Sequence, residues 1–242
     1  MLASSSEVPP LVPRRRFQRA RKPEEKQIRR QAILKAARRS MGEVGLVELS
    51  LSELARRSRV SKPNIYRYFE SREEILLQVW VEEVRDLTER LETTFAGVSV
   101  GDMAGTAKAI TSAFRGQPRL CELTSIISTV IERNLSAAAI AAAKQVLIGL
   151  TLRTAQLLHG RLPAIPIGDC VWAVSAIGAF VAGIWPAAHP VPAVAEVLSR
   201  PEFAGMKPDF DRDLLRFIEV LLSGLLSAGA AAKAANERIP VE

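Results

Sequence analysis

The sequence predicts an all-α protein with a basic N-terminal part of three helices and a larger C-terminal helical part. Apolar residues recur at helical spacing over most of the chain, and no segment alternates apolar and polar residues as a strand does. Residues typical of helix N-termini precede several of these segments. The 242 residues are 48% apolar and 24% charged, which is enough apolar sequence for one large core or two modest ones.

The composition excludes several classes of protein. Two cysteines, Cys121 and Cys170, are too few for a disulfide framework or a four-ligand zinc site, so we expect a reducing compartment, no metal and no cofactor. The chain opens with polar residues, prolines and arginines instead of the apolar segment of a secretory signal. These features predict a cytoplasmic protein.

The net charge of +7 is unevenly distributed. Residues 1–72 hold 18 Lys and Arg against 7 Asp and Glu, a charge of +11, whereas the remainder holds 15 against 19, a charge of −4. A basic segment of this kind favours a polyanionic partner: DNA, RNA or membrane headgroups. A basic surface that only meets solvent is the alternative.

Residues 1–23 are expected to form a disordered basic tail, because the arginines and prolines there leave too few apolar side chains to offset the entropy of ordering. The helix after the tail carries an apolar stripe and ends before Gly45. The stripe consists of Leu34, Ala37, Met41 and Val44.

Two shorter helices are predicted next. Ser50 and Glu53 form an S-x-x-E capping box, in which each side chain satisfies a free backbone amide, and this predicts a helix over residues 51–58. After a turn of about three residues, Ser61 is a good N-cap and begins a helix over residues 62–69.

A second capping box opens the long helix that follows. It pairs Ser71 with Glu74. The apolar stripe of this helix consists of Leu76, Trp80, Val84, Leu87 and Leu91.

Two short helices joined by a tight turn and preceded by a supporting helix are typical of a helix-turn-helix. With Ile65 and Phe69 facing inward, the helix over residues 62–69 offers side chains that suit a DNA groove. Asn can pair with adenine and Arg with guanine, while Lys and Tyr can reach phosphates. Both tyrosines of the chain, Tyr66 and Tyr68, lie in this helix; half-buried packing is the alternative for either one. The pattern predicts binding to double-stranded DNA.

These residues resemble the DNA-binding domain of the tetracycline-repressor (TetR) family. The resemblance covers residues 30–84, about a quarter of the chain, and rests on the stretches LSELA at 51–55 and VSKPNIYRYFESREEIL at 60–76. It implies an all-α homodimer that regulates transcription, usually as a repressor, through a pseudo-palindromic operator. It also implies a C-terminal domain that binds a small molecule and thereby lowers the affinity for DNA.

The resemblance assigns roles by position. It places a basic residue near the DNA backbone at Arg72, and it departs from the family at the turn, where Arg59 stands in place of the usual Gly; Arg with a positive φ is strained by about 1 kcal/mol. The residues implicated in groove or phosphate contacts are Ser50, Lys62, Pro63, Asn64, Tyr66, Arg67 and Tyr68.

The domain organisation expected on this basis has three parts. Residues 1–23 form the tail, residues 24–71 the DNA-binding domain, and residues 72–242 the domain for effector binding and dimerisation. The helices predicted within the last part cover residues 102–115, 118–134, 136–160, 169–189 and 210–236.

The stretch of residues 170–195 has no charged side chain, but its prolines limit the unbroken helix to about 16 residues, short of the roughly 20 that span a membrane. We therefore expect no membrane partner. Small residues recur at every fourth position here, at Ser175, Ala179 and Gly183, and again at Gly224, Ala228 and Ala232. The pattern predicts that both helices pair with their two-fold copies in a four-helix dimer interface; two core helices are the alternative.

An effector pocket would lie among the helices of the C-terminal part. Few charges fall between residues 135 and 195, so a hydrophobic small molecule with few polar groups would fit there. Core packing is the alternative for each candidate residue, and a cap or a hydrogen-bonded role is the alternative for His159. The candidates are Phe95, Met103, Phe114, Cys121, Ile127, His159, Trp172, Phe180 and Trp185.

The sequence leaves three candidate functions for this chain. The first is a repressor released by its effector, to which the arginines of the tail could add phosphate or minor-groove contacts. The second is an enzyme, which the sequence disfavours because neither His159 nor His189 has a nucleophile or metal-ligand motif beside it. The third is a dimeric DNA-binding regulator without an effector.

Overall fold

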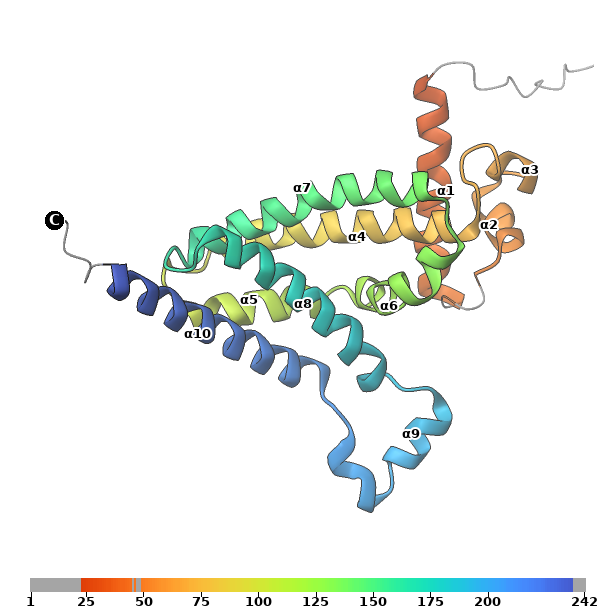
Figure 1. Cartoon of the computed structure of the whole chain (residues 1–242). Helices are drawn as coiled ribbons and strands as arrows, with labels where there is room; N and C mark the ends of the chain where they lie inside the picture. Colours follow the sequence, from red (N-terminus) through yellow and green to blue (C-terminus); the bar gives the residue numbers. More distant parts are fainter. Residues whose placement is uncertain (1–22, 45, 47–48, 237–242) are drawn as a thin grey trace, which may run out of the picture.

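A computed structural model describes residues 23–44, 46 and 49–236. Residues 1–22 of the expected tail 1–23 lie outside the described residues, and Pro23 is not part of a tail but the first residue of a helix. Within them every regular element is a helix (Figure 1), which confirms the predicted fold class. The N-terminal head consists of α1 (Pro23–Val44), α2 (Leu51–Ser58) and α3 (Lys62–Ile65), and α4 (Arg72–Phe95) runs from the head into the C-terminal body.

The body is a bundle built around α4. Figure 1 shows α7 lying along α4, while α10 runs beside α8 and α5. The short α9 lies in an arm between α8 and α10 that extends away from the bundle. The helices of the body are α5 (Met103–Arg115), α6 (Pro118–Ile126), α7 (Ala137–Arg161), α8 (Ile167–Ala188), α9 (Pro192–Leu198) and α10 (Phe210–Asn236).

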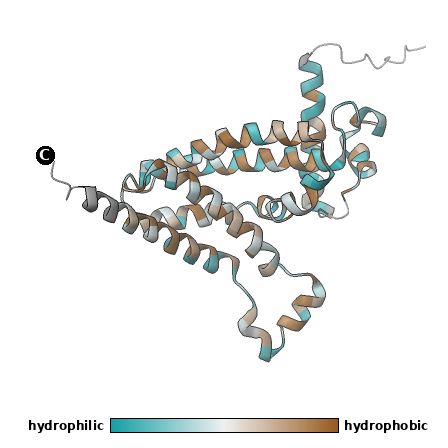
Figure 2. Cartoon of the chain, viewed as in Figure 1, coloured by the Kyte–Doolittle hydropathy of each residue, from teal (hydrophilic) through white to brown (hydrophobic). Residues whose placement is uncertain are grey.

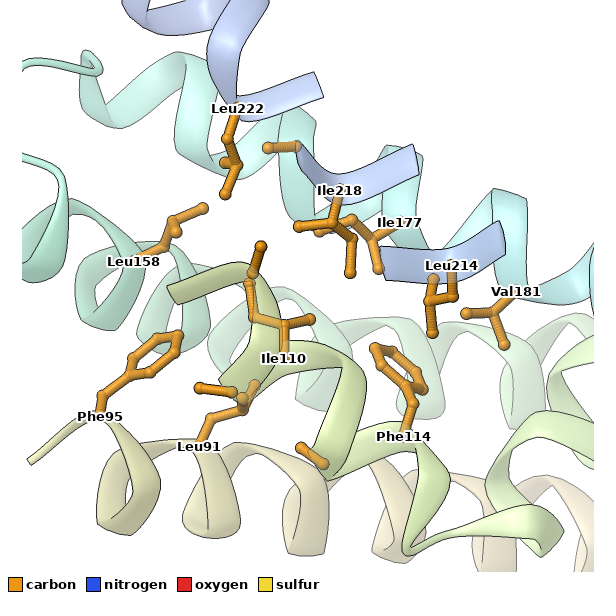
Figure 3. Close-up of a cluster of buried hydrophobic side chains, with 14 of the residues drawn as sticks. Leu91, Phe95, Ile110, Phe114, Leu158, Ile177, Val181, Leu214, Ile218 and Leu222 are labelled. Atoms are coloured by element: carbon orange, nitrogen blue, oxygen red, sulfur yellow. The ribbon is translucent and has the colours of Figure 1, made fainter. Parts of the chain in front are cut away.

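The body core brings together side chains from α4, α5, α7, α8 and α10 (Figure 3). Leu91 and Phe95 of α4, Phe114 of α5, Leu158 of α7 and Ile218 of α10 belong to this one cluster. Removing each large side chain of this kind from water contributes about 1.5–3 kcal/mol. The two thiols lie in the same core, and burial raises the pKa of Cys121 to about 12 and that of Cys170 to about 11.

The core of the head extends into the body. Leu34 of α1, Leu54 of α2 and Phe69 after α3 are buried in one cluster with the first turns of α4. The same cluster continues to Leu123 of α6 and to Ile127, the first residue after that helix. The head is therefore packed against α4 and α6, and an independent domain ending at residue 71 stays a prediction.

The predicted helix over residues 62–69 is too long. The α-helix ends at Ile65 and a turn covers the next three residues. The amides of Arg67 and Tyr68 bond three residues back, to Asn64 and Ile65, and such shorter bonds replace the α-helical pattern in the last turn. Phe69 still bonds to Ile65 across 3.1 Å, so both inward-facing residues keep their places.

The predicted helix over residues 118–134 is also not regular. It changes at Ile127 to a wider π-helical turn (Ile127–Ile131) and then to a 3-10 turn (Glu132–Asn134). The wide turn contains Ile127, Thr129, Val130 and Ile131, which are β-branched and lose rotamer freedom in an α-helix.

Pro186 lies inside α8 and does not end it, so the expected limit of about 16 residues for the unbroken helix is wrong. α7 and α8, of 25 and 22 residues, are each long and apolar enough to cross a membrane. Two such helices are weak evidence for a membrane protein, because core helices of soluble proteins pass the same test. Figure 2 shows apolar residues mixed with polar ones along α7. α9 and the 3-10 helix Pro201–Met206 that follows it were not predicted from the sequence.

Candidate DNA-binding site

Side-chain caps fix the start of α2. The Ser50 hydroxyl accepts a hydrogen bond from the Glu53 amide at 3.2 Å. The Glu53 carboxylate does not complete the predicted capping box but accepts bonds from Arg56 and Arg57. These bonds lower the pKa of Glu53 to about 2. Ser50 therefore acts as the N-cap of α2 in this structure.

The turn between α2 and α3 depends on Arg59. Its φ of 55° and ψ of 27° place it in the left-handed region, a conformation that favours glycine. Arg59 is the one residue other than glycine with a positive φ in the described part of the chain. The backbone at Ser61 is extended, and Pro63 occupies the first turn of α3, where a missing amide costs little.

The candidate DNA contacts on and after α3 differ in exposure. Ile65 and Phe69 are buried, and this turns Lys62, Tyr66 and Arg67 to solvent; Tyr66 is 56% exposed. Pro63 is exposed as well. Asn64 is half-buried, and Tyr68 packs with part of its ring against the head core.

Arg72 is committed to the protein backbone. Its guanidinium donates to the carbonyl oxygens of Leu46 and Leu49, the former at 2.6 Å, and lies 3.3 Å from the Glu73 carboxylate. Ser71 caps α4 by accepting from the Glu74 amide at 3.1 Å. Arg72 therefore fixes the segment that precedes α2 to the start of α4, which leaves fewer of its donors for phosphate.

A buried ionic cluster, which the sequence did not reveal, joins the head to the body. The Glu83 side chain of α4 is 3% exposed and accepts from Arg38 of α1 at 3.0 Å and from Arg119 of α6 at 2.6 Å. Arg119 also donates to the carbonyl oxygen of Arg38 at 2.8 Å, and Arg38 also pairs with Asp86. The one signal in the sequence is that Glu83 immediately precedes Val84 of the apolar stripe.

A small apolar cavity of about 40 Å³ lies in the body next to α4. Two predicted pocket residues, Phe95 and Phe114, line it. Its polar group is Thr154, whose hydroxyl lies 3.0 Å from that of Thr88. The rest of the lining consists of Leu87, Leu91, Ile110, Leu158, Val174 and Ile177.

The other seven pocket candidates lie elsewhere, within the core or at its edges. Cys121 is in the body core and Met103 packs against it, whereas Ile127 belongs to the head cluster. Nδ1 of His159 lies 2.8 Å from the carbonyl oxygen of Ile165. Trp172 is 56% exposed.

The remaining two candidates make aromatic contacts. Phe180 stacks on Phe217 with ring centroids 4.1 Å apart, and Trp185 stacks on His189 at 3.8 Å. Among the described residues no group of three or more His, Cys, Asp or Glu could hold a metal ion.

Comparisons with known proteins cover nearly the whole described chain. Residues 33–79 match the family model for bacterial regulatory proteins of the tetR family. Residues 77–229 match the model described as a tetracyclin repressor-like C-terminal domain, which covers more than half of the chain. The chain belongs to the TetR family. It is a DNA-binding transcriptional regulator with a helix-turn-helix, and regulators of this family dimerise and bind small molecules as a class.

Comparison with solved structures finds TetR proteins at low sequence identity. A TetR transcriptional regulator from Rhodococcus sp. RHA1 is 20% identical, with 82% of this chain and 97% of that chain covered and a TM-score of 0.53. A TetR variant from Acinetobacter baumannii AYE in complex with minocycline is 17% identical, with 79% and 93% covered and a TM-score of 0.49. A search of curated proteins found no match.

Proposed function

We propose that this TetR-family protein is a repressor that binds a pseudo-palindromic operator as a homodimer and leaves it when a hydrophobic small molecule binds. The observation that supports DNA contact is the exposure of Lys62, Tyr66 and Arg67 above the buried Ile65 and Phe69. Two such helices would enter successive major grooves about 34–36 Å apart.

The predicted contact residues differ in their proposed roles. Lys62, Tyr66 and Arg67 would reach bases or phosphates, because their side chains are free to do so. Ser50, Pro63, Asn64 and Tyr68 would contribute nearer the edge of the groove. Arg72 would lie near the DNA backbone while its guanidinium holds the segment before α2.

The effector would enter the apolar cavity between α4, α5, α7 and α8. A space of about 40 Å³ holds about one water, whereas small-molecule pockets usually measure about 300–1,000 Å³. A ligand would therefore bind only to an expanded body. Because the cavity is lined by Leu87, Leu91 and Phe95 of α4, expansion would displace the helix that carries the head. A tenfold loss of DNA affinity requires about 1.4 kcal/mol of such unequal binding.

Lipophilic compounds should raise the melting temperature of the protein and release it from DNA. An effector present at about 100 times its Kd adds about 2.7 kcal/mol of stability. The measurement is a thermal-shift screen, followed by operator release with an operator recovered by selecting bound fragments from the source genome. In a matched variant, Leu91→Trp fills the cavity and should abolish the shift.

A DNA-binding regulator without an effector is the second candidate, and the small cavity favours it. In that case no lipophilic compound would both stabilise the protein and release DNA. Hits that do both would exclude this candidate.

The proposed dimer uses the exposed faces of α8 and α10. Five small residues of these helices are all exposed in the protomer: Ser175, Ala179 and Gly183 on α8, and Gly224 and Ala228 on α10. The side chain of Ala232 lies outside the described residues. Exposed apolar residues such as Trp172 and Val220 lie on the same two helices.

Gly224→Leu should convert the dimer to monomer while the protomer keeps its fold. Gly224 is exposed and a Cβ there meets nothing within 4 Å, so the protomer has space for a larger residue that a close-packed partner helix would not have. We expect dimerisation to weaken at least about tenfold, measured by sedimentation at micromolar concentration. The matched control is Gly149→Leu on α7, where a Cβ also meets nothing. A wild-type protein that sediments as a 26.4 kDa monomer would contradict the dimer.

The remaining expectations follow the family. TetR-family regulators are generally soluble and non-enzymatic. We propose that this one is cytoplasmic, has no catalytic activity and no membrane partner, and divides into a tail, a DNA-binding domain and a C-terminal domain at residues 23/24 and 71/72.

A further inference from the structure

A polar cleft of about 330 Å³ lies where the head meets the body. Its walls come from α1, α4, α6, the turn before α6 and the end of α8. It shares no lining residue with the apolar cavity, so the two are separate spaces. A volume of this size falls at the lower end of the range of small-molecule sites.

Most charged groups of the cleft are already paired. Glu83 accepts from Arg38 and Arg119, and Asp86 also accepts from Arg38. These residues form a neutralised wall that belongs to the ionic cluster between head and body. They leave little capacity for a ligand.

Three other polar groups in the cleft lack such partners. Gln117 is 5% exposed, and its Oε1 is the one buried side-chain oxygen or nitrogen without a hydrogen bond in the described part of the chain. The Glu122 carboxylate is half-buried and has no ion pair among the described residues; burial raises its pKa. A buried acceptor without a donor is unfavourable, so this arrangement favours a ligand that supplies one.

Arg90 offers the complementary group. Its guanidinium forms no ion pair with a described acid, and it lies over Gly116, where a Cβ would be only 3.0 Å from Nη1. The absence of a side chain at Gly116 lets Arg90 lie against the turn before α6. A guanidinium in this position can bind a carboxylate through two parallel hydrogen bonds.

We propose that this cleft is a second small-molecule site, for a small carboxylic acid that also carries a hydroxyl or amino group. The carboxylate binds Arg90, and the hydroxyl or amino group donates to Gln117 Oε1 and Glu122. Trp185 provides an aromatic side for a short apolar substituent. The site goes beyond the proposed hydrophobic effector of the body.

A molecule bound in the cleft would contact the residues that join the head to the body. Arg38 of α1 and Arg119 of α6 face it, and both hold Glu83 of α4. A ligand here changes DNA affinity only if it binds one arrangement of these three helices more tightly than another.

Ligand-detected NMR on the full-length protein without DNA tests the site. The probes are L-lactate, L-serine and L-leucine at about 10 mM, where binding as weak as millimolar is detected. Acetate, which has no second donor, and ethanolamine, which has no carboxylate, are the control ligands. We expect at least one acid to bind about tenfold more tightly than both controls.

Two variants connect the binding to the cleft. Arg90→Gln and Gln117→Leu should each weaken it about tenfold, and Arg153→Gln, at an exposed arginine of α7, should leave it unchanged. Arg90 is exposed, so its variant decides the result if Gln117→Leu does not fold. No binding by any of the three acids, equal binding by acetate, or unchanged binding in Arg90→Gln overturns the proposal. Because DNA is absent, none of these outcomes bears on the proposed repressor function.

Discussion

Replacing Tyr66 or Arg67 with alanine should abolish operator binding and leave the fold intact. A specific contact to a base contributes about 1–3 kcal/mol, and a dimer loses it twice, so affinity should fall by about 30-fold to 20,000-fold. Both side chains are exposed in the protomer. Their removal should therefore change the free energy of unfolding by no more than about 0.5 kcal/mol. Fluorescence anisotropy with the selected operator and a thermal melt give the two quantities.

The matched control for these variants is Arg153→Ala. It removes the same charge as Arg67→Ala but from α7 of the body, where Arg153 pairs with Glu92. We expect its operator affinity to stay within about threefold of wild type. If both head variants bind the operator as tightly as wild type, α3 is not the recognition helix.

Glu83→Ala should be the most destabilising of the single charge removals. The carboxylate is 3% exposed and holds two arginines whose side chains are each 29% exposed. Loss of one member of a buried ion pair costs about 3–5 kcal/mol, and the partial exposure of Arg38 and Arg119 favours the lower end. For a chain of this size, 3 kcal/mol corresponds to a fall of about 6–12 °C in Tm.

Glu92→Ala is the comparison, because Glu92 also lies on α4 and also pairs with an arginine, but both side chains of that pair are 50% exposed. Exposed pairs contribute about 0–1 kcal/mol, so its Tm should change little. Equal melting temperatures for the two variants would show that the cluster at Glu83 does not stabilise the joint.

Local signals predicted most of the fold. The bounds of α2 and α10 agree with the predicted ranges, because the cap at Ser50 and the apolar stripe of α10 depend only on neighbouring residues. The end of α3 was not predicted. Ile65 and Phe69 face the same side whether the backbone hydrogen bonds between them span three residues or four, so the apolar spacing does not distinguish a turn from a further turn of α-helix. α9 has seven residues and no buried side chain, so it leaves no periodic pattern.

The site was predictable where one helix presents it and not where several helices meet. The exposure of Tyr66 and Arg67 follows from the spacing of Ile65 and Phe69. The contact of Glu83 with α1 and α6 joins residues 36 and 45 positions apart, and no periodicity reports such a distance. The apolar cavity depends in the same way on how α4, α5, α7 and α8 pack, so only two of its lining residues were predicted.

The continuity of the head core with α4 and α6 has a consequence for protein engineering. Exchanging heads between family members is a natural way to redirect a regulator to a new operator. A junction at residues 71/72 would cut between Phe69 and its buried neighbours in α4, and would face a foreign head with the native Leu123 and Ile127. A functional chimera of this protein would have to transplant the start of α4 together with the head, and match the end of α6 to both.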